Sequence, residues 1–235
     1  MKKPIYKNWW FWVIIVVVVI LIIPSGSDAN DDGTTTTTTT TTSGNPSQKP
    51  SKPRFDEDKV VSQLQVTEYS LKTDFWNYSF FEIKNNSEYN IEITVNVKYY
   101  NSADELIGAK NSSVSAVGSG QTILMYFMPD EDFVRTEYDI SVDEDDWFES
   151  AVSDLSYEVV TAKDKEIVSV TNNGEEPADF VQVSMLFFKN GKVVDFGWTY
   201  CVDDDSEIKP GKTITKEIYV YEAYDSYKVY LEGRR

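Results

Sequence analysis

The sequence predicts an all-β protein: two tandem repeated antiparallel β-sandwiches that follow an N-terminal transmembrane helix and a disordered Thr-rich linker. Three observations predict the sandwiches, namely a bias toward aromatic and β-branched residues, strictly alternating apolar segments, and an internal repeat. Tyrosine alone occurs 15 times among 235 residues, and such side chains suit half-buried pleated surfaces. The globular part contains no convincing amphipathic helical pattern.

Alternation of apolar and polar residues marks the strands. Residues 91–99 carry their apolar side chains on odd positions only, and the apolar residues Val181, Val183, Met185 and Phe187 repeat this spacing in the second copy. This period of two places one face on a core and the other in water. Turn signals lie beside both segments, with Asn-Asn triplets at 85–87 and 172–174 and an Asn-Gly pair at 190–191. Short strands separated by such turns favour antiparallel sandwiches of immunoglobulin-like size.

The globular region repeats itself with an offset of about ninety residues. Five landmarks occur in the same order in both copies: 61–64 with 152–155, 85–87 with 172–174, 99–100 with 187–188, 120–122 with 211–213, and 138–142 with 227–231. This order predicts two homologous β-sandwich domains, at residues 55–146 and 147–235.

An uncharged hydrophobic run occupies residues 9–23 and follows Lys2, Lys3 and Lys7. The positive-inside rule keeps residues 1–8 in the cytoplasm and sends the rest of the chain across the membrane. The run therefore predicts a single-pass transmembrane anchor at the cell membrane, with extracellular C-terminal domains. The alternative is a cleavable signal peptide, with a small-x-small site at 27–29.

The composition of residues 24–54 predicts a disordered Thr/Pro/Ser-rich stalk. They include nine consecutive threonines at 34–42, followed by a Ser- and Pro-rich stretch. Such a composition cannot bury a core, so the segment is expected to be an extended, solvated spacer.

The chain is strongly acidic, with a formal net charge of −17. This charge makes nucleic acid an improbable partner, because binding a polyanion requires Lys and Arg to replace counterions. Carboxylate clusters at 56–58, 130–132, 143–146 and 203–205 are either solvated charge runs or loop ligands for Ca²⁺. None has EF-hand spacing, so no metal ligands are assigned.

The sequence predicts no enzyme. It contains no histidine, which removes the commonest general base, the usual catalytic triads and most zinc sites. No phosphate-binding glycine loop occurs. We therefore assign no catalytic or cofactor-binding residues and no cofactor. The single cysteine, Cys201, lies among apolar neighbours and is expected to be a buried structural thiol.

Aromatic residues in predicted turns are candidates for binding. Phe75, Trp76 and Tyr78 fall in a hairpin where the first copy is longer than the second, and Trp147 and Phe148 lie at the domain junction. Flat rings in loops stack on sugars or anchor a protein partner. The alternative is that these rings pack at the core or its rim.

The order of elements resembles the FxLYD-type domains of Gram-positive cell envelopes. The resemblance is carried by the Asn-Asn turns, the alternating strands that end in two aromatic residues, and the Pro-Gly-x-Thr segment at 210–213. At the position of the naming motif this chain has VKYYN at 97–101 and MLFFK at 185–189. The resemblance implies a β-sandwich and an extracytoplasmic role, and it brings no catalytic residues.

These observations predict a membrane-anchored, non-catalytic binding or adaptor protein of the cell envelope. The membrane is contacted through residues 9–23, and the further partner is an envelope protein or a wall glycan. The alternative is a structural or regulatory envelope protein without a dedicated ligand; a hydrolase with paired carboxylates is kept only for contrast. The ligand and the oligomeric state stay open.

Overall fold

The computed structural model describes residues 54–235, in which nearly all regular structure is β-strand, so the predicted all-β sandwich fold is confirmed. The predictions for 1–8, 9–23 and, apart from its last residue, 24–54 lie outside the described residues. Among residues 54–235, no helix is long and apolar enough to cross a membrane.

Six strands belong to the first repeat. They are β1 (Leu64–Lys72), β2 (Asn77–Asn85), β3 (Ile91–Tyr100), β4 (Leu106–Val117), β5 (Thr122–Phe127) and β6 (Arg135–Glu144). The second repeat contains β7 (Leu155–Thr161), β8 (Lys165–Asn172), β9 (Ala178–Lys189), β10 (Lys192–Tyr200), β11 (Glu207–Ile208), β12 (Thr213–Tyr219) and β13 (Ser226–Arg234). A short 3₁₀-helix, η2 (Val152–Asp154), precedes β7.

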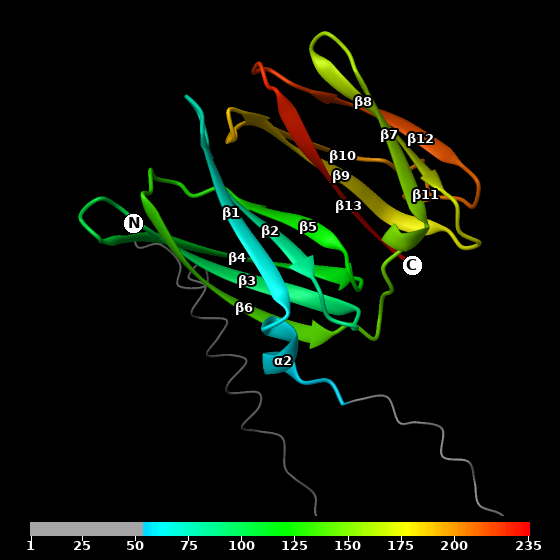
Figure 1. Ribbon diagram of the computed structural model, residues 1–235, viewed down its shortest axis with the longest axis horizontal. Helices are drawn as coiled ribbons and strands as arrows, with labels where there is room; N and C mark the ends of the chain where they lie inside the picture. The colour runs from blue at the N-terminus through cyan, green and yellow to red at the C-terminus, as the bar shows by residue number, and fades with distance from the viewer. Residues whose placement is uncertain (1–53) are drawn as a thin grey trace, which may run out of the picture. The chain divides into compact units, whose positions relative to one another are not determined.

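Each repeat builds two antiparallel sheets in the same order (Figure 1). In the first, β1-β2-β5 faces β4-β3-β6; in the second, β7-β8-β12 faces a sheet in which β10, β11 and β13 all pair with β9. The shared order agrees with the repeat seen in the sequence. All of these strands lie in one compact unit, Lys52–Arg235, so the two-domain division at residue 146 stays a prediction.

A separate hydrophobic core lies inside each sandwich. The odd positions of β3 from Ile91 to Tyr99 are all buried in the first core. Val181, Val183, Met185 and Phe187 of β9 are buried in the second. The alternation in the sequence therefore predicts the core-facing side of both strands correctly.

A third cluster of buried residues joins the two repeats. It is formed by Leu71, Phe80 and Leu124 of sheet β1-β2-β5 and by Leu186, Phe188 and Tyr230 of the sheet around β9. Strict alternation predicts solvent for Leu186 and Phe188, and this prediction is wrong. Both faces of β9 are covered, one by its own sandwich and one by the first repeat, and Ser184–Phe188 is continuously buried.

Polar contacts accompany this third cluster. Lys228 on β13 donates hydrogen bonds to both carboxylate oxygens of Glu82 on β2, at 3.0 and 2.8 Å, and to the hydroxyl of Tyr69 at 2.9 Å. The hydroxyl of Tyr230 also donates to Glu82. Because the Glu82 side chain is only 17% exposed, its charge is compensated within the interface.

One short helix lies before β1, although the sequence predicts no helix in the globular part. α2 (Glu57–Val61) begins after Asp56, whose side chain accepts a hydrogen bond from the backbone N–H of Lys59 at 3.2 Å. The helix buries Val60 in the first core. A five-residue helix is too short for amphipathic periodicity to reveal it, so the capping carboxylate is its main sequence signal.

A buried side-chain amide, that of the first asparagine, holds the Asn-Asn turn in both repeats. The side-chain nitrogen of Asn85 donates to the carbonyls of Tyr89 and Val117, at 2.9 and 3.0 Å. The side-chain nitrogen of Asn172 donates to those of Glu176 and Ile208, at 2.7 and 2.8 Å. The amide thus connects two loops at one end of each sandwich.

Replacing Asn172 with alanine is expected to lower the free energy of unfolding by about 2 kcal/mol, because two buried carbonyls lose their donors at about 1 kcal/mol each. Urea denaturation of the 52–235 fragment measures it. Asn173→Ala is the control, because the neighbouring Asn173 side chain is exposed. Equal effects of the two changes would contradict this role for Asn172.

Candidate functional site

An aromatic cleft lies where the β1–β2 turn meets β10 and the loop after β12. Its volume is about 820 Å³, and its walls include the aromatic residues Phe75, Trp76, Tyr78, Phe196 and Tyr221. This size is in the range of small-molecule and oligomer binding clefts. Phe75, Trp76 and Tyr78, the aromatic turn residues that the sequence suggests as binding candidates, therefore lie together. They line the same cleft as Phe196 and Tyr221 of the second repeat.

The β1–β2 turn is held by Thr73. Its hydroxyl oxygen accepts hydrogen bonds from the backbone N–H groups of Phe75 and Trp76, at 3.3 and 2.9 Å. Since the Thr73 side chain fixes the turn, the two rings are not needed to hold it and project outward. Phe75 is 85% exposed and Trp76 is 57% exposed, far more than core packing would leave.

The opposite wall of the cleft is organised by Asp195. Its carboxylate accepts hydrogen bonds from the backbone N–H groups of Tyr221 and Glu222, at 2.6 and 3.2 Å. These bonds fasten the loop after β12 to β10 and leave the Tyr221 ring 85% exposed. Tyr78 also lines the cleft, and burial, together with the negative charge of Asp195, raises the pKa of its hydroxyl above the usual value.

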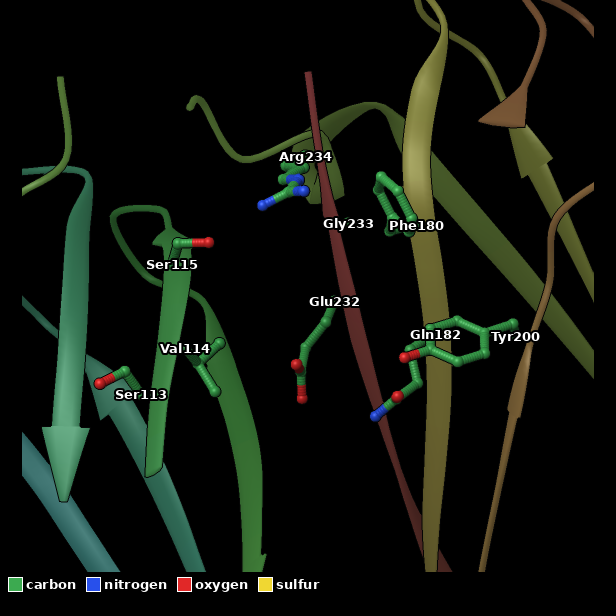
Figure 2. Close-up of a pocket in the computed structure, with 9 residues that line it drawn as sticks. All are labelled: Ser113, Val114, Ser115, Phe180, Gln182, Tyr200, Glu232, Gly233 and Arg234. Carbon is green, nitrogen blue, oxygen red and sulfur yellow. The ribbon is translucent and has the colours of Figure 1, made fainter. Parts of the chain in front are cut away.

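A second, smaller cavity of about 270 Å³ lies between β4 and the sheet around β9. Figure 2 shows Glu232 and Arg234 pointing from β13 toward β4, where the Ser115 hydroxyl points toward them. The Ser113 hydroxyl points the other way and lies 2.7 Å from the hydroxyl of Thr94. A further cavity of about 270 Å³ also has Glu232 in its wall. Glu232 thus lies between two hollows.

Burial dominates the electrostatics of this cavity. Removal of solvent raises the pKa of Glu232 to about 7 from an ordinary value of 4.5. The guanidinium of Arg234 lies 4.0 Å from the ring centroid of Phe148 and 4.9 Å from that of Phe180. These cation–π contacts hold the positive group beside the cavity.

A β-bulge shapes this part of the site. Glu232 pairs with Gln182 and Arg234 pairs with Asp179, so β9 has one more residue than β13 between the two pairs. The extra residue allows Phe180 to leave the regular pleat, and its φ is 50°. A left-handed conformation is costly for a bulky residue, and bulges commonly redirect side chains at functional sites.

The acidic clusters have structural partners. The carboxylate of Asp145 accepts bonds from the backbone N–H groups of Ala116, Trp147 and Phe148, at 2.8, 3.0 and 3.0 Å. Asp132 binds Lys72 and Asn77, and Asp205 forms an ion pair with Lys209. Within residues 54–235, no three His, Cys, Asp or Glu side chains gather in a way that would hold a metal ion.

The remaining sequence candidates lie elsewhere. Cys201 is buried in the second core, as expected, and burial raises the pKa of its thiol to about 11. Trp147 is 90% exposed and is not part of the aromatic cleft. Phe148, its neighbour, instead contacts the guanidinium of Arg234.

Sequence reasoning misses Tyr221, Glu232 and Arg234. Tyr221 lies in a loop whose sequence carries no motif. Glu232 and Arg234 continue the alternation of β13 on a face that the sequence assigns to solvent, so their partial burial depends on the neighbouring repeat. The only signal available is the run of residues 228, 230, 232 and 234, which places Lys, Tyr, Glu and Arg on one face.

No protein-family model matches this chain, and comparison with curated proteins finds no match. Among solved structures, the chain is similar to a transglutaminase of red sea bream, with 11% sequence identity and a TM-score of 0.25. The match covers 73% of this chain and 29% of the transglutaminase. Likeness at this level carries no argument about activity.

Proposed function

We propose that the chain is a membrane-anchored, extracytoplasmic and non-catalytic binding protein of the cell envelope. Support for the location comes from the basic residues before the hydrophobic run at 9–23, and from the resemblance to FxLYD-type domains. In this proposal the stalk holds the two repeats away from the membrane.

The aromatic cleft is the observation that carries the binding role. Phe75, Trp76 and Tyr221 come from two repeats and converge on one hollow while remaining highly exposed. Several large aromatic rings are exposed to water at one place. Such a patch indicates a binding surface, because covering the rings with a ligand is energetically favourable. Asp74 and Glu222 on its rim add acceptors for hydroxyl or amino groups.

A wall glycan is the ligand that the cleft favours. Sugar rings have an apolar face that stacks on a flat aromatic ring, and their hydroxyls donate to carboxylates. The hollow shape suits a chain that enters it better than a flat protein surface. The acidic chain disfavours a polyanionic ligand, so a neutral or amino sugar is expected.

Binding of the 52–235 fragment to envelope glycans tests the proposal. Trp76→Ala and Tyr221→Ala are each expected to weaken binding by about tenfold or more, as for aromatic hot spots. Trp147→Ala is the matched control, because this tryptophan is more exposed than Trp76 and lies outside the cleft.

Two outcomes would change the conclusion. Saturable capture of one envelope protein, lost in the Trp76 variant, would replace the glycan by a protein ligand. Failure of the folded fragment to bind any envelope fraction would favour a structural or regulatory envelope protein without a dedicated ligand.

A further inference from the structure

A second group of exposed aromatic side chains lies at the end of β10. Trp198 is 44% exposed and Tyr200 is 47% exposed, and their ring centroids lie 5.6 Å apart in an edge-on arrangement. The residues beside Trp198 in the same sheet, Ser184 and Tyr230, are buried. The covering that buries β9 and β13 at this level therefore does not extend over β10.

These two rings share a strand face with the aromatic cleft. The pairing of β10 with β9 is regular from Asp195 to Tyr200, so Phe196, Trp198 and Tyr200 point to the same side of the sheet. Phe196 lines the aromatic cleft, and Tyr200 lines the smaller cavity. Figure 2 shows the Tyr200 ring next to the side chain of Gln182, its partner on β9. β10 thus carries aromatic rings from one hollow to the other.

Tyr126 of β5 connects the two hollows. Its ring centroid lies 4.9 Å from that of Phe196, and Tyr126 also lines the further cavity, which shares Gln182 and Glu232 with the smaller one. Aromatic side chains therefore follow one another from the cleft to Tyr200. Phe196 and Tyr200 are four residues apart on a strand and so lie about 13 Å apart, which is farther than one sugar ring reaches.

We propose that the aromatic cleft and the Trp198–Tyr200 pair are two subsites for one linear, neutral glycan chain that lies along β10. This inference rests on the proposed function, because the cleft is taken to bind a glycan. Two separate stacking surfaces favour a chain over a disaccharide, since only a chain contacts both at once and gains from their combined affinity.

The surroundings of Tyr200 suit a sugar. The side-chain amide of Gln182 and the hydroxyl of Ser115 line the same hollow, and both groups can donate to and accept from sugar hydroxyls. Phe180, which the β-bulge turns out of the regular pleat, adds a second apolar wall. The net charge of −17 disfavours acidic sugars, so the chain is expected to be neutral.

Calorimetric titration of the 52–235 fragment with envelope glycan fragments of two lengths tests the proposal. The probes are disaccharides and strands of at least about six sugar units, which span the roughly 13 Å between the subsites. The long strands are expected to bind about tenfold more tightly than the disaccharides, or better. Trp76→Ala, which alters the cleft, should weaken the binding of both probes.

The variants Trp198→Ala and Tyr200→Ala are each expected to weaken long-strand binding by about tenfold and to leave disaccharide binding, which the larger cleft provides, unchanged. Tyr157→Ala is the matched control for Tyr200→Ala, because Tyr157 is equally exposed but lies on β7. Trp147→Ala is the control for Trp198→Ala, and both control variants should bind the long strands normally. Circular dichroism of each variant establishes that it is folded.

Three results would overturn the two-subsite proposal and leave the proposed function intact. These are equal affinity of the wild-type fragment for both lengths, normal long-strand binding by the folded Trp198 and Tyr200 variants, or equal weakening of both lengths in these variants. Dissociation of a dimer by Trp198→Ala, measured by sedimentation velocity, would assign the pair to contact with a second copy instead. Failure of the folded wild-type fragment to bind either length would contradict the proposed function itself.

Discussion

Replacing Phe80 with alanine is expected to lower the free energy of unfolding by about 4 kcal/mol, the cost typical of removing a fully buried phenylalanine. Phe80 is completely buried, and its ring lies 5.0 Å from that of Phe196 in an edge-on arrangement. It contributes to the cluster between the repeats and not to the core of either sandwich. Urea or thermal denaturation of the 52–235 fragment measures the change.

Phe75→Ala is the control for this experiment, because it removes the same side chain from a position that is 85% exposed. Its effect on stability is expected to lie within about 0.5 kcal/mol. If Phe80→Ala were no more destabilising than Phe75→Ala, the packing of the two repeats would not contribute to stability.

Stability is expected to fall as the pH rises from 4.5 toward 7, because of Glu232. The pKa of this carboxyl is about 7 in the folded chain, against 4.5 ordinarily. Between these values the folded state binds more protons than the unfolded state does, so raising the pH favours unfolding. The full difference corresponds to about 3 kcal/mol, present as stability below pH 4.5 and lost above pH 7.

Glu232→Gln should remove this loss, because the amide does not ionise. The measurement is the free energy of unfolding at about pH 5 and pH 8 for both chains. The wild-type fragment should lose about 2.5 kcal/mol more than the Gln variant between these conditions, because part of the loss has already occurred at pH 5. Glu158→Gln, at an exposed carboxylate on β7, controls for the general effect of removing one negative charge. Parallel profiles of wild type and Glu232→Gln would contradict the assignment.

The strands and cores could be predicted from the sequence because they depend on local alternation. The odd positions of β3 face a core within their own sandwich, so period two is sufficient to identify them. The repeated Asn-Asn triplets likewise mark equivalent turns, although only the structure shows that Asn85 and Asn172 bond to buried carbonyls.

The interface between repeats could not be predicted by the same reasoning. Leu186 and Met185 lie on opposite faces of β9, and an alternating apolar pattern assigns only one of these two faces to a core. A run such as residues 185–188, apolar at every position, indicates a strand covered on both sides. It does not identify the covering element, and for the same reason the partial burial of Glu232 could not be recognised.

The sequence indicates only some of the residues that form the aromatic cleft. Phe75 and Trp76 stood out because they lie in an extended hairpin turn of the first copy. No sequence pattern indicates Tyr221. Its position beside Phe75 and Trp76 depends on a hydrogen bond to the carboxylate of Asp195, 26 residues earlier in the chain. Long-range hydrogen bonds of this kind leave no local pattern.

The continuous burial of Ser184–Phe188 also has a consequence for solubility. This segment contains no charge and no proline, and its strand is rich in residues that favour sheets, which is the composition of aggregation-prone segments. Within residues 54–235, its outer face packs against the first repeat. A variant that weakens this contact is therefore expected to self-associate through β9 while its second sandwich is still folded.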